Sequence, residues 1–157
     1  MKVKYFDLEN KRVFITGGGS GIGASIVEHF CEQGSEVYFI DINEDESKKL
    51  IEDIKNKNYS LPTFIKCDLL NIKELQKTIA DIISEKGPID ILINNAANDT
   101  RHKIDDVTEE YWDERMNVNL RHFFFTVQSV KKSMIDNGGG AIINMGSTSW
   151  MVGQGGM

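Results

Sequence analysis

Cysteine, proline and long apolar runs are scarce in this sequence. Its two cysteines, Cys31 and Cys67, are too few for a disulfide framework, so we expect two small buried thiols in a reduced, cytoplasmic protein. No apolar run approaches the roughly 18 residues that a membrane-spanning helix needs. The first residues, MKVKYFDLENKR, lack the continuous apolar stretch of a signal peptide. The sequence therefore disfavours a secreted disulfide scaffold and a membrane protein.

Positive charge is also in deficit. The sequence has 18 Lys and Arg against 24 Asp and Glu, a formal net charge of −6, which disfavours nucleic acid and anionic membrane surfaces as partners. It contains no Gly-Lys-Ser/Thr, the motif of a nucleoside triphosphatase loop, and no cluster with the spacing of metal ligands. Its 157 residues, 40% of them hydrophobic, suit one soluble domain with its own core, covering residues 1–157.

Short β-rich runs alternate with longer helical patterns along the chain. We expect strands at 12–16, 36–40, 63–66, 89–94 and 141–145, and helices at 22–33, 44–57, 72–86 and 109–137. This alternation predicts an α/β fold, a Rossmann-type doubly wound parallel sheet of five strands with right-handed crossovers. Ile22, Ile26, Val27 and Phe30 are spaced to share one buried helix face. Thr108 is expected to cap the last helix.

The first expected strand runs into a glycine-rich turn that opens a helix, Thr16-Gly17-Gly18-Gly19-Ser20-Gly21-Ile22-Gly23. Gly17 allows the tight turn, Gly21 lets the backbone approach a pyrophosphate, and Gly23 lets helix and strand pack closely. The helix N-terminus adds free N–H groups and the positive end of a dipole. The pattern predicts a dinucleotide site, with a glycine turn that binds no ligand as the alternative.

An acidic residue follows this turn at an informative distance. Asp41 ends the second expected strand, 18 residues after Gly23, near the roughly 20-residue spacing of the acid that binds the adenosine ribose hydroxyls. A carboxylate there repels a 2′-phosphate, and Ser20 in the turn is not basic, so NAD is favoured over NADP. The alternative is that Asp41 caps the next helix.

The glycine turn and Asp41, together with later motifs, resemble the short-chain dehydrogenase/reductase family. Five matches in chain order carry the resemblance: Thr16-Gly17-x-x-x-Gly21-x-Gly23, Asp41, Cys67-Asp68-Leu69, Asn94-Asn95-Ala96-Ala97, and Asn117-Val118-Asn119-Leu120 leading to Ile142-Ile143-Asn144-Met145-Gly146-Ser147. A methyltransferase also has a glycine turn and an acid after its second strand, but the last two matches disfavour that class.

The resemblance implies a set of cofactor-binding residues: Gly17, Gly19, Ser20, Gly21, Ile22, Gly23, Asp41, Ile42, Cys67, Asp68, Leu69, Asn95, Ala96 and Ala97. It places Asp68 and Leu69 beside the adenine, and Asn95 and Ala96 along the cofactor. It gives Asn94 the role of stabilising the central strand. For Asp68 the alternative is a helix N-cap.

The resemblance also implies two catalytic residues. Asn119 matches the asparagine that holds a water in a proton relay, and Ser147 matches the serine that hydrogen-bonds the reacting oxygen. The alternatives are an exposed helical amide for Asn119 and a turn hydroxyl for Ser147. Ser149 is the nearest competitor for the serine role.

Within the family, four segments resemble sugar (aldose, D-xylose-like) 1-dehydrogenases, which oxidise the anomeric carbon to a lactone: Asn98-Asp99-x-Arg101-His102, Tyr111-Trp112, Asn119-Leu120-Arg121-His122 and Gly146-Ser147-x-Ser149-Trp150. The loop 98–102 leaves the carboxyl end of a strand, where its polar groups can bind sugar hydroxyls. Alternatively, Arg101 and His102 pair with Asp105, Asp106 or helix ends.

Other residues of this region are interpreted as structural. We expect Arg121 and His122 to support the fold, and His29 to lie at or near the surface. Phe123, Phe124 and Phe125 are interpreted as core and interface packing rather than as a ligand site.

The family's general base is missing from this sequence. The resemblance assigns it to the tyrosine of Tyr-x-x-x-Lys, whose lysine lowers the tyrosine pKa, and no such motif occurs in these residues. It would lie just beyond Met157. We therefore expect a chain truncated relative to the family fold and inactive as given, with an exposed edge at 141–145 and homo-oligomers formed through the helix 109–137.

The sequence is consistent with two functions. The first is an NAD-dependent oxidoreductase that acts on a CH–OH group, of a sugar oxidised from aldose to lactone. The alternative is a non-catalytic NAD-binding fragment or module.

Overall fold

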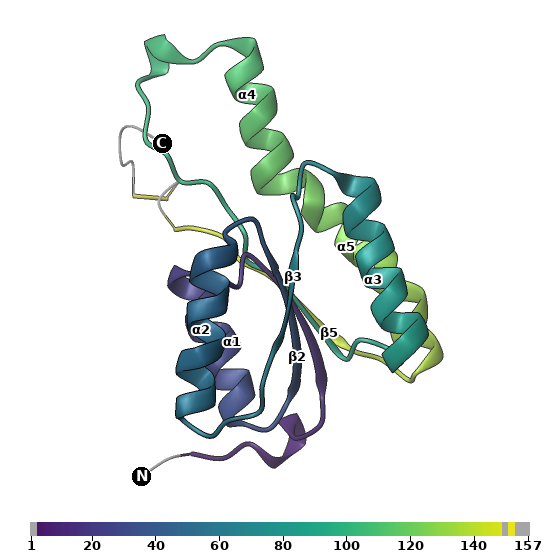
Figure 1. Ribbon diagram of the computed structural model, residues 1–157. Coiled ribbons are helices and arrows are strands. Elements are labelled where there is room, and N and C mark those ends of the chain that lie inside the picture. The colour runs from purple at the N-terminus through teal and green to yellow at the C-terminus, as the bar shows by residue number, and fades with distance from the viewer. Residues whose placement is uncertain (1–2, 149–150, 153–157) are drawn as a thin grey trace.

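The computed structural model describes residues 3–148 and 151–152 and contains a five-stranded parallel sheet of order β3-β2-β1-β4-β5 (Figure 1). The strands are β1 (Arg12–Thr16), β2 (Glu36–Asp41), β3 (Thr63–Lys66), β4 (Ile91–Asn94) and β5 (Ala141–Asn144). The register pairs Thr16 with Ile40 on one side and with Asn94 on the other. The carboxyl ends of the three central strands therefore lie level, and the predicted doubly wound sheet is confirmed.

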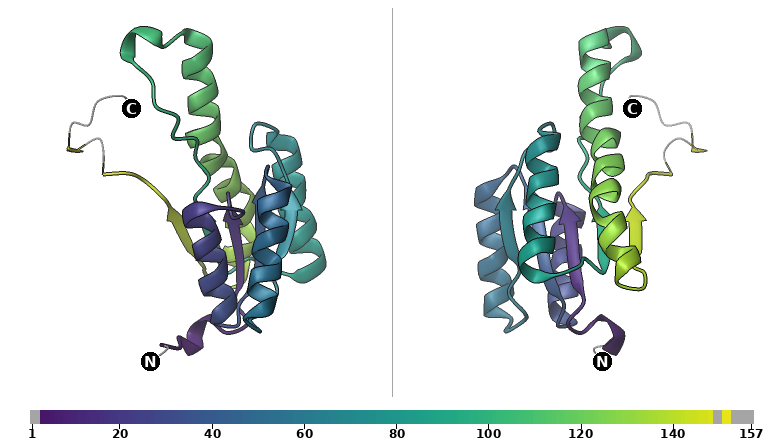
Figure 2. Two further views of the ribbon diagram at one scale, coloured as in Figure 1. Left: turned by 60° about the vertical axis from the view of Figure 1, so that its left-hand side comes forward. Right: turned by 90° about the vertical axis from the view of Figure 1, so that its right-hand side faces the viewer.

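Helices cover both faces of the sheet. The α-helices are α1 (Gly21–Glu32), α2 (Glu44–Asn56), α3 (Ile72–Lys86), α4 (Glu109–Met116) and α5 (His122–Asp136), and two 3₁₀ turns are η1 (Phe6–Leu8) and η2 (Ile104–Asp106). Figures 1 and 2 show α1 and α2 on one face and α3 and α5 on the other, with α4 extending beyond the sheet. No helix among the described residues is long and apolar enough to cross a membrane.

The core lies in two layers because side chains alternate across the strands. Phe14 and Leu92 pack with α3 and α5, whereas Ile15 and Phe39 pack with α1 and α2. Each apolar side chain buried in this way contributes roughly 1.5–3 kcal/mol. Both faces are covered, so the central strands have near-continuous apolar sequences.

Both cysteines are free and buried, as expected. Burial, with a smaller effect of Glu28, raises the pKa of Cys31 to about 12. Burial, with Glu74 and Asp68 nearby, raises the pKa of Cys67 to about 11. Both thiols therefore stay protonated at neutral pH and behave as small apolar side chains.

The expected helix 109–137 is interrupted. A π-helical turn, η3 (Asn117–Arg121), separates α4 from α5. A π turn bonds residue i to i+5 instead of i+4 and often marks a functional site. The spacing of apolar residues does not reveal this turn. A π turn adds one residue to the helix, which only shifts the later apolar residues around the helix axis. Thr108 caps α4 as predicted, with its hydroxyl accepting a hydrogen bond from the Tyr111 amide.

Two further expectations about packing had different outcomes. Ile22 was expected on the buried face of α1, and this was wrong, since its side chain is 67% exposed. It lies in the first turn of α1, at the edge of a pocket, while Val27 faces the sheet. The exposed edge is as expected, because β5 ends the sheet and all four of its residues are exposed.

Candidate functional site

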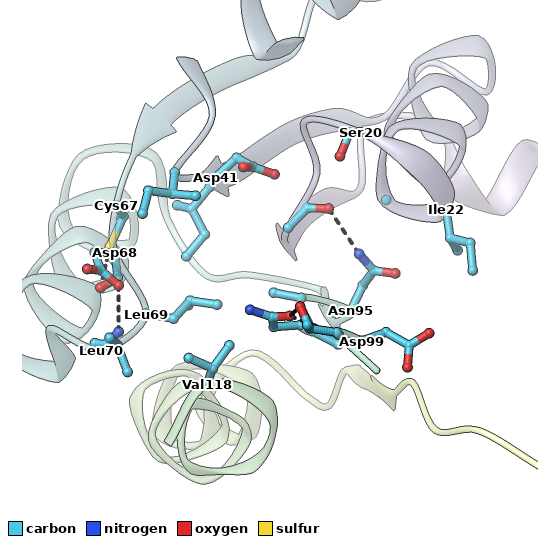
Figure 3. Close-up of a pocket in the computed structure, with 18 of the residues that line it drawn as sticks. Ser20, Ile22, Asp41, Cys67, Asp68, Leu69, Leu70, Asn95, Asp99 and Val118 are labelled. Atoms are coloured by element: carbon cyan, nitrogen blue, oxygen red, sulfur yellow. Dashed lines mark hydrogen bonds between the residues drawn. The ribbon is translucent and has the colours of Figure 1, made fainter. Parts of the chain in front are cut away.

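A pocket of about 770 Å³ lies at the carboxyl ends of the central strands (Figure 3). This is where parallel α/β sheets bind ligands, and its volume is typical of ligand pockets, about 300–1,000 Å³. Twelve of the predicted cofactor-binding residues line it, namely Gly17, Ser20, Ile22, Gly23, Asp41, Ile42, Cys67, Asp68, Leu69, Asn95, Ala96 and Ala97. Gly19 and Gly21 belong to the same turn but do not line the pocket.

The glycine turn is shaped by two close contacts and one open position. Gly17 has φ 66°, and a Cβ there would lie 2.7 Å from Cα of Ala96. A Cβ on Gly23 would collide with the carbonyl oxygen of Gly17. Gly21, by contrast, has φ 55°, and among the described residues nothing outside its own helix and chain neighbours lies within 4 Å of where a Cβ would stand. The turn is therefore closed towards the fold at Gly17 and Gly23 and open at Gly21.

The N-terminus of α1 faces this pocket. Its N-cap residue, Ser20, makes no side-chain hydrogen bond to the helix, and Ser20, Ile22 and Gly23 all line the pocket. In α2 and α3, the side chains of Asn43 and Asn71 accept a hydrogen bond from the third amide. The first turn of α1 thus keeps N–H donors and a positive dipole end for an anion.

Asp41 ends β2 at the pocket wall. Its Oδ2 accepts a hydrogen bond from the Gly19 amide at 2.8 Å, and its Oδ1 accepts one from the Asn43 amide at 2.9 Å. The alternative that Asp41 caps α2 is wrong, because Asn43 is the capping residue and binds the Glu46 amide. Asp41 instead braces the glycine turn.

Asp68 and its neighbours lie on the same side of the pocket as Asp41 and away from Ser20 and Ile22, and Figure 3 shows Cys67, Leu69 and Leu70 beside Asp68. The Asp68 Oδ1 accepts a hydrogen bond from the Leu70 amide at 2.9 Å. The alternative that Asp68 caps α3 is also wrong, because Asn71 does so through the Glu74 amide.

The segment after β4 is fixed by hydrogen bonds from several directions. The Asn95 side chain donates to the carbonyls of Thr16 and Gly17, and the Thr16 hydroxyl accepts from the amides of Asn95 and Ala96. Asn94 is fully buried, donates to Asn144 on β5 and accepts from Thr126 on α5. Asn94 therefore joins the central strand to its neighbours, as the resemblance implied.

Asn119 lies in the π turn η3 and holds the loop after β4. Its Oδ1 accepts from the Asn98 amide at 2.7 Å, and its Nδ2 donates to the Asn98 carbonyl at 3.2 Å. The alternative of an exposed helical amide is wrong, since the side chain is half-buried and doubly bonded. Ser147 follows β5 and is exposed. Neither Asn119 nor Ser147 lines the pocket, and Ser149 lies outside the described residues.

The loop 98–102 is attached to α4. The Tyr111 hydroxyl lies 3.1 Å from Nδ1 of His102 and donates to the Thr100 carbonyl at 3.4 Å. Arg101 pairs with Asp99 at 3.2 Å. Among the described residues, the expected pairing of Arg101 and His102 with Asp105 or Asp106 is therefore wrong, whereas His102 does contact a helix end through Tyr111 in the first turn of α4.

The side chains interpreted as structural lie away from the pocket lining. His29 is exposed, and Phe125 packs against the core. Phe124 is 66% exposed on α5. His122 is fully buried between Thr16 and the Val118 carbonyl. No cluster of three metal-ligating side chains is present among the described residues.

Comparison with known proteins agrees with this geometry. A sequence model of the family described as short chain dehydrogenase matches residues 11–157. The chain belongs to the short chain dehydrogenase family.

Relatives within the family are sugar dehydrogenases by name. The chain is 48% identical over 149 residues to the D-xylose 1-dehydrogenase of Caulobacter vibrioides, covering 95% of this chain and 58% of that protein. It is 42% identical to the probable galactose dehydrogenase of Rhizobium meliloti, covering 93% of this chain and 57% of that protein. The chain thus spans about 58% of the length of the first of these curated relatives.

A solved structure of a 7 alpha-hydroxysteroid dehydrogenase complexed with NADH and 7-oxo glycochenodeoxycholic acid has a TM-score of 0.86 to this chain. It is 30% identical, and the match covers 96% of this chain and 58% of that structure. The family fold seen in the sheet is thus shared with a complex that holds a nicotinamide cofactor.

Four residues that line the pocket were not predicted from the sequence: Ile40, Leu70, Glu114 and Val118. Figure 3 shows Val118 opposite the segment that carries Asn95. Val118 was part of a quoted motif, but only its neighbour Asn119 was given a role. Glu114 is one helical turn before Val118, so i to i+4 spacing from that motif is the signal that could have found it. Asn98, Asp99 and Thr100, from the loop expected to bind sugar, also line the pocket.

Proposed function

We propose that this protein is an NAD-dependent oxidoreductase that acts on a CH–OH group, and that the group belongs to a sugar oxidised from aldose to lactone. Family membership and two relatives named as sugar dehydrogenases support the reaction class. The single observation that supports cofactor binding most strongly is the pocket that unites the glycine turn, Asp41 and Asp68.

The residues of the pocket fit a dinucleotide. The open position at Gly21 and the N-terminus of α1 suit a pyrophosphate, which needs close approach to backbone N–H groups. Asp41 would accept from the adenosine ribose hydroxyls, and Ile42, Cys67, Asp68 and Leu69 would enclose the adenine. The segment from Asn95 to Ala97 would line the remainder. When bound, NAD supplies the acceptor for the hydride that leaves the substrate carbon.

NAD is preferred over NADP in this proposal because of Asp41. A 2′-phosphate on the ribose would bring negative charge close to this carboxylate. Two like charges about 4 Å apart repel by roughly 1 kcal/mol in water and about 4 kcal/mol near a protein surface. A difference of about 1.4 kcal/mol is tenfold in affinity and lies between these two values, so we expect about tenfold preference for NAD.

The catalytic roles are carried over from the family. Ser147 would hydrogen-bond the oxygen of the reacting CH–OH group, and Asn119 would hold a water that passes on its proton. The proton must leave the hydroxyl as the hydride leaves the carbon, which needs a general base. These 157 residues contain no Tyr-x-x-x-Lys, so we expect them, by themselves, to bind NAD without turnover.

The residues 1–157 are proposed to form one dinucleotide-binding domain that self-associates. Trp112, Met116, Leu120 and Phe124 are exposed at four-residue spacing along α4, η3 and α5, which places them on one helix face. We take a second copy as the partner of this face. The reducing cytoplasm is the compartment we propose, since both cysteines are free thiols.

Calorimetric titration of the chain with NAD and with NADP tests the cofactor proposal. One-to-one binding of NAD, about tenfold tighter than NADP, would support it, and the absence of NAD binding would refute it.

Formation of NADH is then measured with D-xylose and D-galactose. Turnover by these residues would contradict the claim that they lack the general base, and binding without turnover also fits the alternative of a non-catalytic NAD-binding module. A longer form that carries Tyr-x-x-x-Lys separates the two, because turnover of an aldose supports the oxidoreductase.

A further inference from the structure

His122 is buried where the start of α5, the π turn η3 and the end of β1 meet. It begins α5 directly after the π turn η3, and its ring is fully buried. Its Nε2 lies 3.4 Å from Oγ1 of Thr16 at the end of β1, and its Nδ1 lies 2.9 Å from the carbonyl oxygen of Val118. The Phe123 ring packs edge-on against it at 4.6 Å between centroids.

The partners of the ring determine where its proton sits. The Val118 carbonyl can only accept, so Nδ1 must carry a hydrogen and donate it. The Thr16 oxygen already accepts from the amides of Asn95 and Ala96, at 3.0 and 3.1 Å. A hydroxyl oxygen has two lone pairs, so Thr16 has only its own O–H left to offer. Nε2 therefore accepts and carries no hydrogen.

This pattern requires a neutral imidazole with its proton on Nδ1. A second proton, on Nε2, would point at the Thr16 hydroxyl oxygen, whose lone pairs already accept from two amides. The hydrogen bond between Thr16 and His122 would then be lost. Burial favours the same state, because it lowers the pKa of His122 to about 4, although the Val118 carbonyl works in the opposite direction. Geometry and burial therefore agree on one protonation state.

The two bonds connect opposite sides of the pocket. On one side, Thr16 holds the amides of Asn95 and Ala96, both of which line the pocket. On the other, Val118 lines the pocket from the π turn, next to Asn119, which holds the Asn98 backbone. His122 itself does not line the pocket and reaches both sides from behind.

We propose that His122 is a positioning residue for the cofactor pocket: as the Nδ1–H tautomer, it ties the Asn95–Ala96 segment, through Thr16, to the π turn that carries Val118 and Asn119. The inference rests on the proposed function for the identity of the cofactor, but its hydrogen-bond arrangement is independent of it.

The first test is the tautomer itself, measured on the unmodified chain with ¹⁵N-labelled histidine by NMR at pH 7. The chain has three histidines, and His29→Gln and His102→Gln assign the signals. The proposal predicts a proton on Nδ1 of His122 and none on Nε2. A proton on Nε2, or a doubly protonated ring, would overturn it, whether or not NAD binds.

The second test uses matched variants and NAD titration. His122→Phe keeps an aromatic ring without nitrogen, and we expect NAD affinity to fall about tenfold, as for loss of one buried hydrogen bond. His122→Gln, which offers one donor and one acceptor, should recover most of the affinity. Thr16→Val should weaken binding, whereas Thr16→Ser, which keeps the hydroxyl, should not.

The double variant distinguishes positioning from mere stability. If His122 acts through Thr16, His122→Phe and Thr16→Val together should weaken NAD binding by much less than the product of their single effects. A purely structural His122 would lower the free energy of unfolding while folded protein kept its NAD affinity, which would contradict the proposal. If the unmodified chain binds no NAD, the proposed function fails, and the tautomer decides this inference.

Discussion

The carboxylate of Asp41 and the backbone amide of Gly19 are joined by a hydrogen bond of 2.8 Å. Through this bond, the acid at the end of β2 braces the glycine turn between β1 and α1. The same side chain also accepts from the Asn43 amide, so both oxygens have backbone partners. Asp41 thus has a structural role in the turn in addition to the cofactor role proposed for it.

These two roles can be separated by Asp41→Asn. An amide oxygen can still accept from Gly19, the side-chain NH2 loses the bond from the Asn43 amide, and the negative charge that would repel a 2′-phosphate is removed. We expect the preference for NAD over NADP to fall at least severalfold, and the free energy of unfolding to fall by about 1 kcal/mol for the one lost hydrogen bond. Asp41→Ala is the comparison and should weaken both the turn and NAD binding. Titration with both dinucleotides checks this, and an unchanged preference in Asp41→Asn would contradict the role of charge.

Gly23 should not tolerate even a methyl group. A Cβ there would collide with the Gly17 carbonyl and approach the Asn95 amide nitrogen at 2.7 Å. We expect Gly23→Ala to lower the free energy of unfolding by about 3 kcal/mol, at the upper end of overpacking effects. Gly146→Ala is a matched control, because no described residue apart from its chain neighbours lies within 4 Å of its Cβ position and its φ is not positive. Urea unfolding of the two variants tests the difference, and equal stabilities would contradict the packing described.

The sequence predicted the sheet, its strand ranges to within two residues and most of the pocket lining because those features depend on local pattern. Buried strands such as Arg12–Thr16 are apolar on both faces, and the glycine turn needs specific glycines. Caps were harder to predict, since Asp41 and Asp68 and the true caps Asn43 and Asn71 are all residue types that cap helices. Only the hydrogen bonds distinguish them.

The π turn Asn117–Arg121 and the start of α5 make contacts with residues distant in sequence. Asn119 reaches Asn98, 21 residues earlier, and His122 reaches Thr16, 106 residues earlier. Apolar spacing along one helix carries no record of such partners. Ile22 follows the helical pattern, yet it lies in the first turn of α1, where its exposed side chain lines the pocket instead of the core.

Stability should depend on pH through His122. The pKa of this ring is lowered from 6.5 to about 4 in the folded state, so the unfolded chain binds more protons between these values. The free energy of unfolding should therefore rise with pH from about 4 to 6.5, with a contribution of the order of 3 kcal/mol. The contribution is complete above pH 6.5 and lost as pH falls to about 4.

The control for this dependence is His122→Gln, which has no titratable ring. The free energy of unfolding in urea is measured for both proteins at each pH. Subtracting the value of the variant from that of the unmodified chain removes the contribution of carboxylates elsewhere. The difference should grow as pH rises through this window. If the free energies of unfolding of the two proteins change in parallel with pH, the pKa of His122 is not lowered by folding.

Self-association should respond to Phe124. Its ring is 66% exposed, and Trp112 on the same helix face is 59% exposed. Phe124→Glu would bury a charge in the proposed contact, and we expect the dissociation constant to rise at least about tenfold. Ser84→Glu on the exposed surface of α3 adds the same charge as a control. Analytical ultracentrifugation measures the dissociation constant. If the unmodified chain sediments as a monomer at all concentrations, a contact through this face is contradicted.

Binding of NAD in the pocket at the carboxyl ends of the strands can be tested by mapping backbone amide shifts on addition of NAD. We expect saturable changes concentrated at Gly17–Gly23, Asp41–Ile42, Cys67–Leu69 and Asn95–Ala97, with smaller changes at the same positions for an equal concentration of NADP. Changes centred on another surface, such as the hollow between Tyr38 and Thr78, or no saturable change at all, would contradict it.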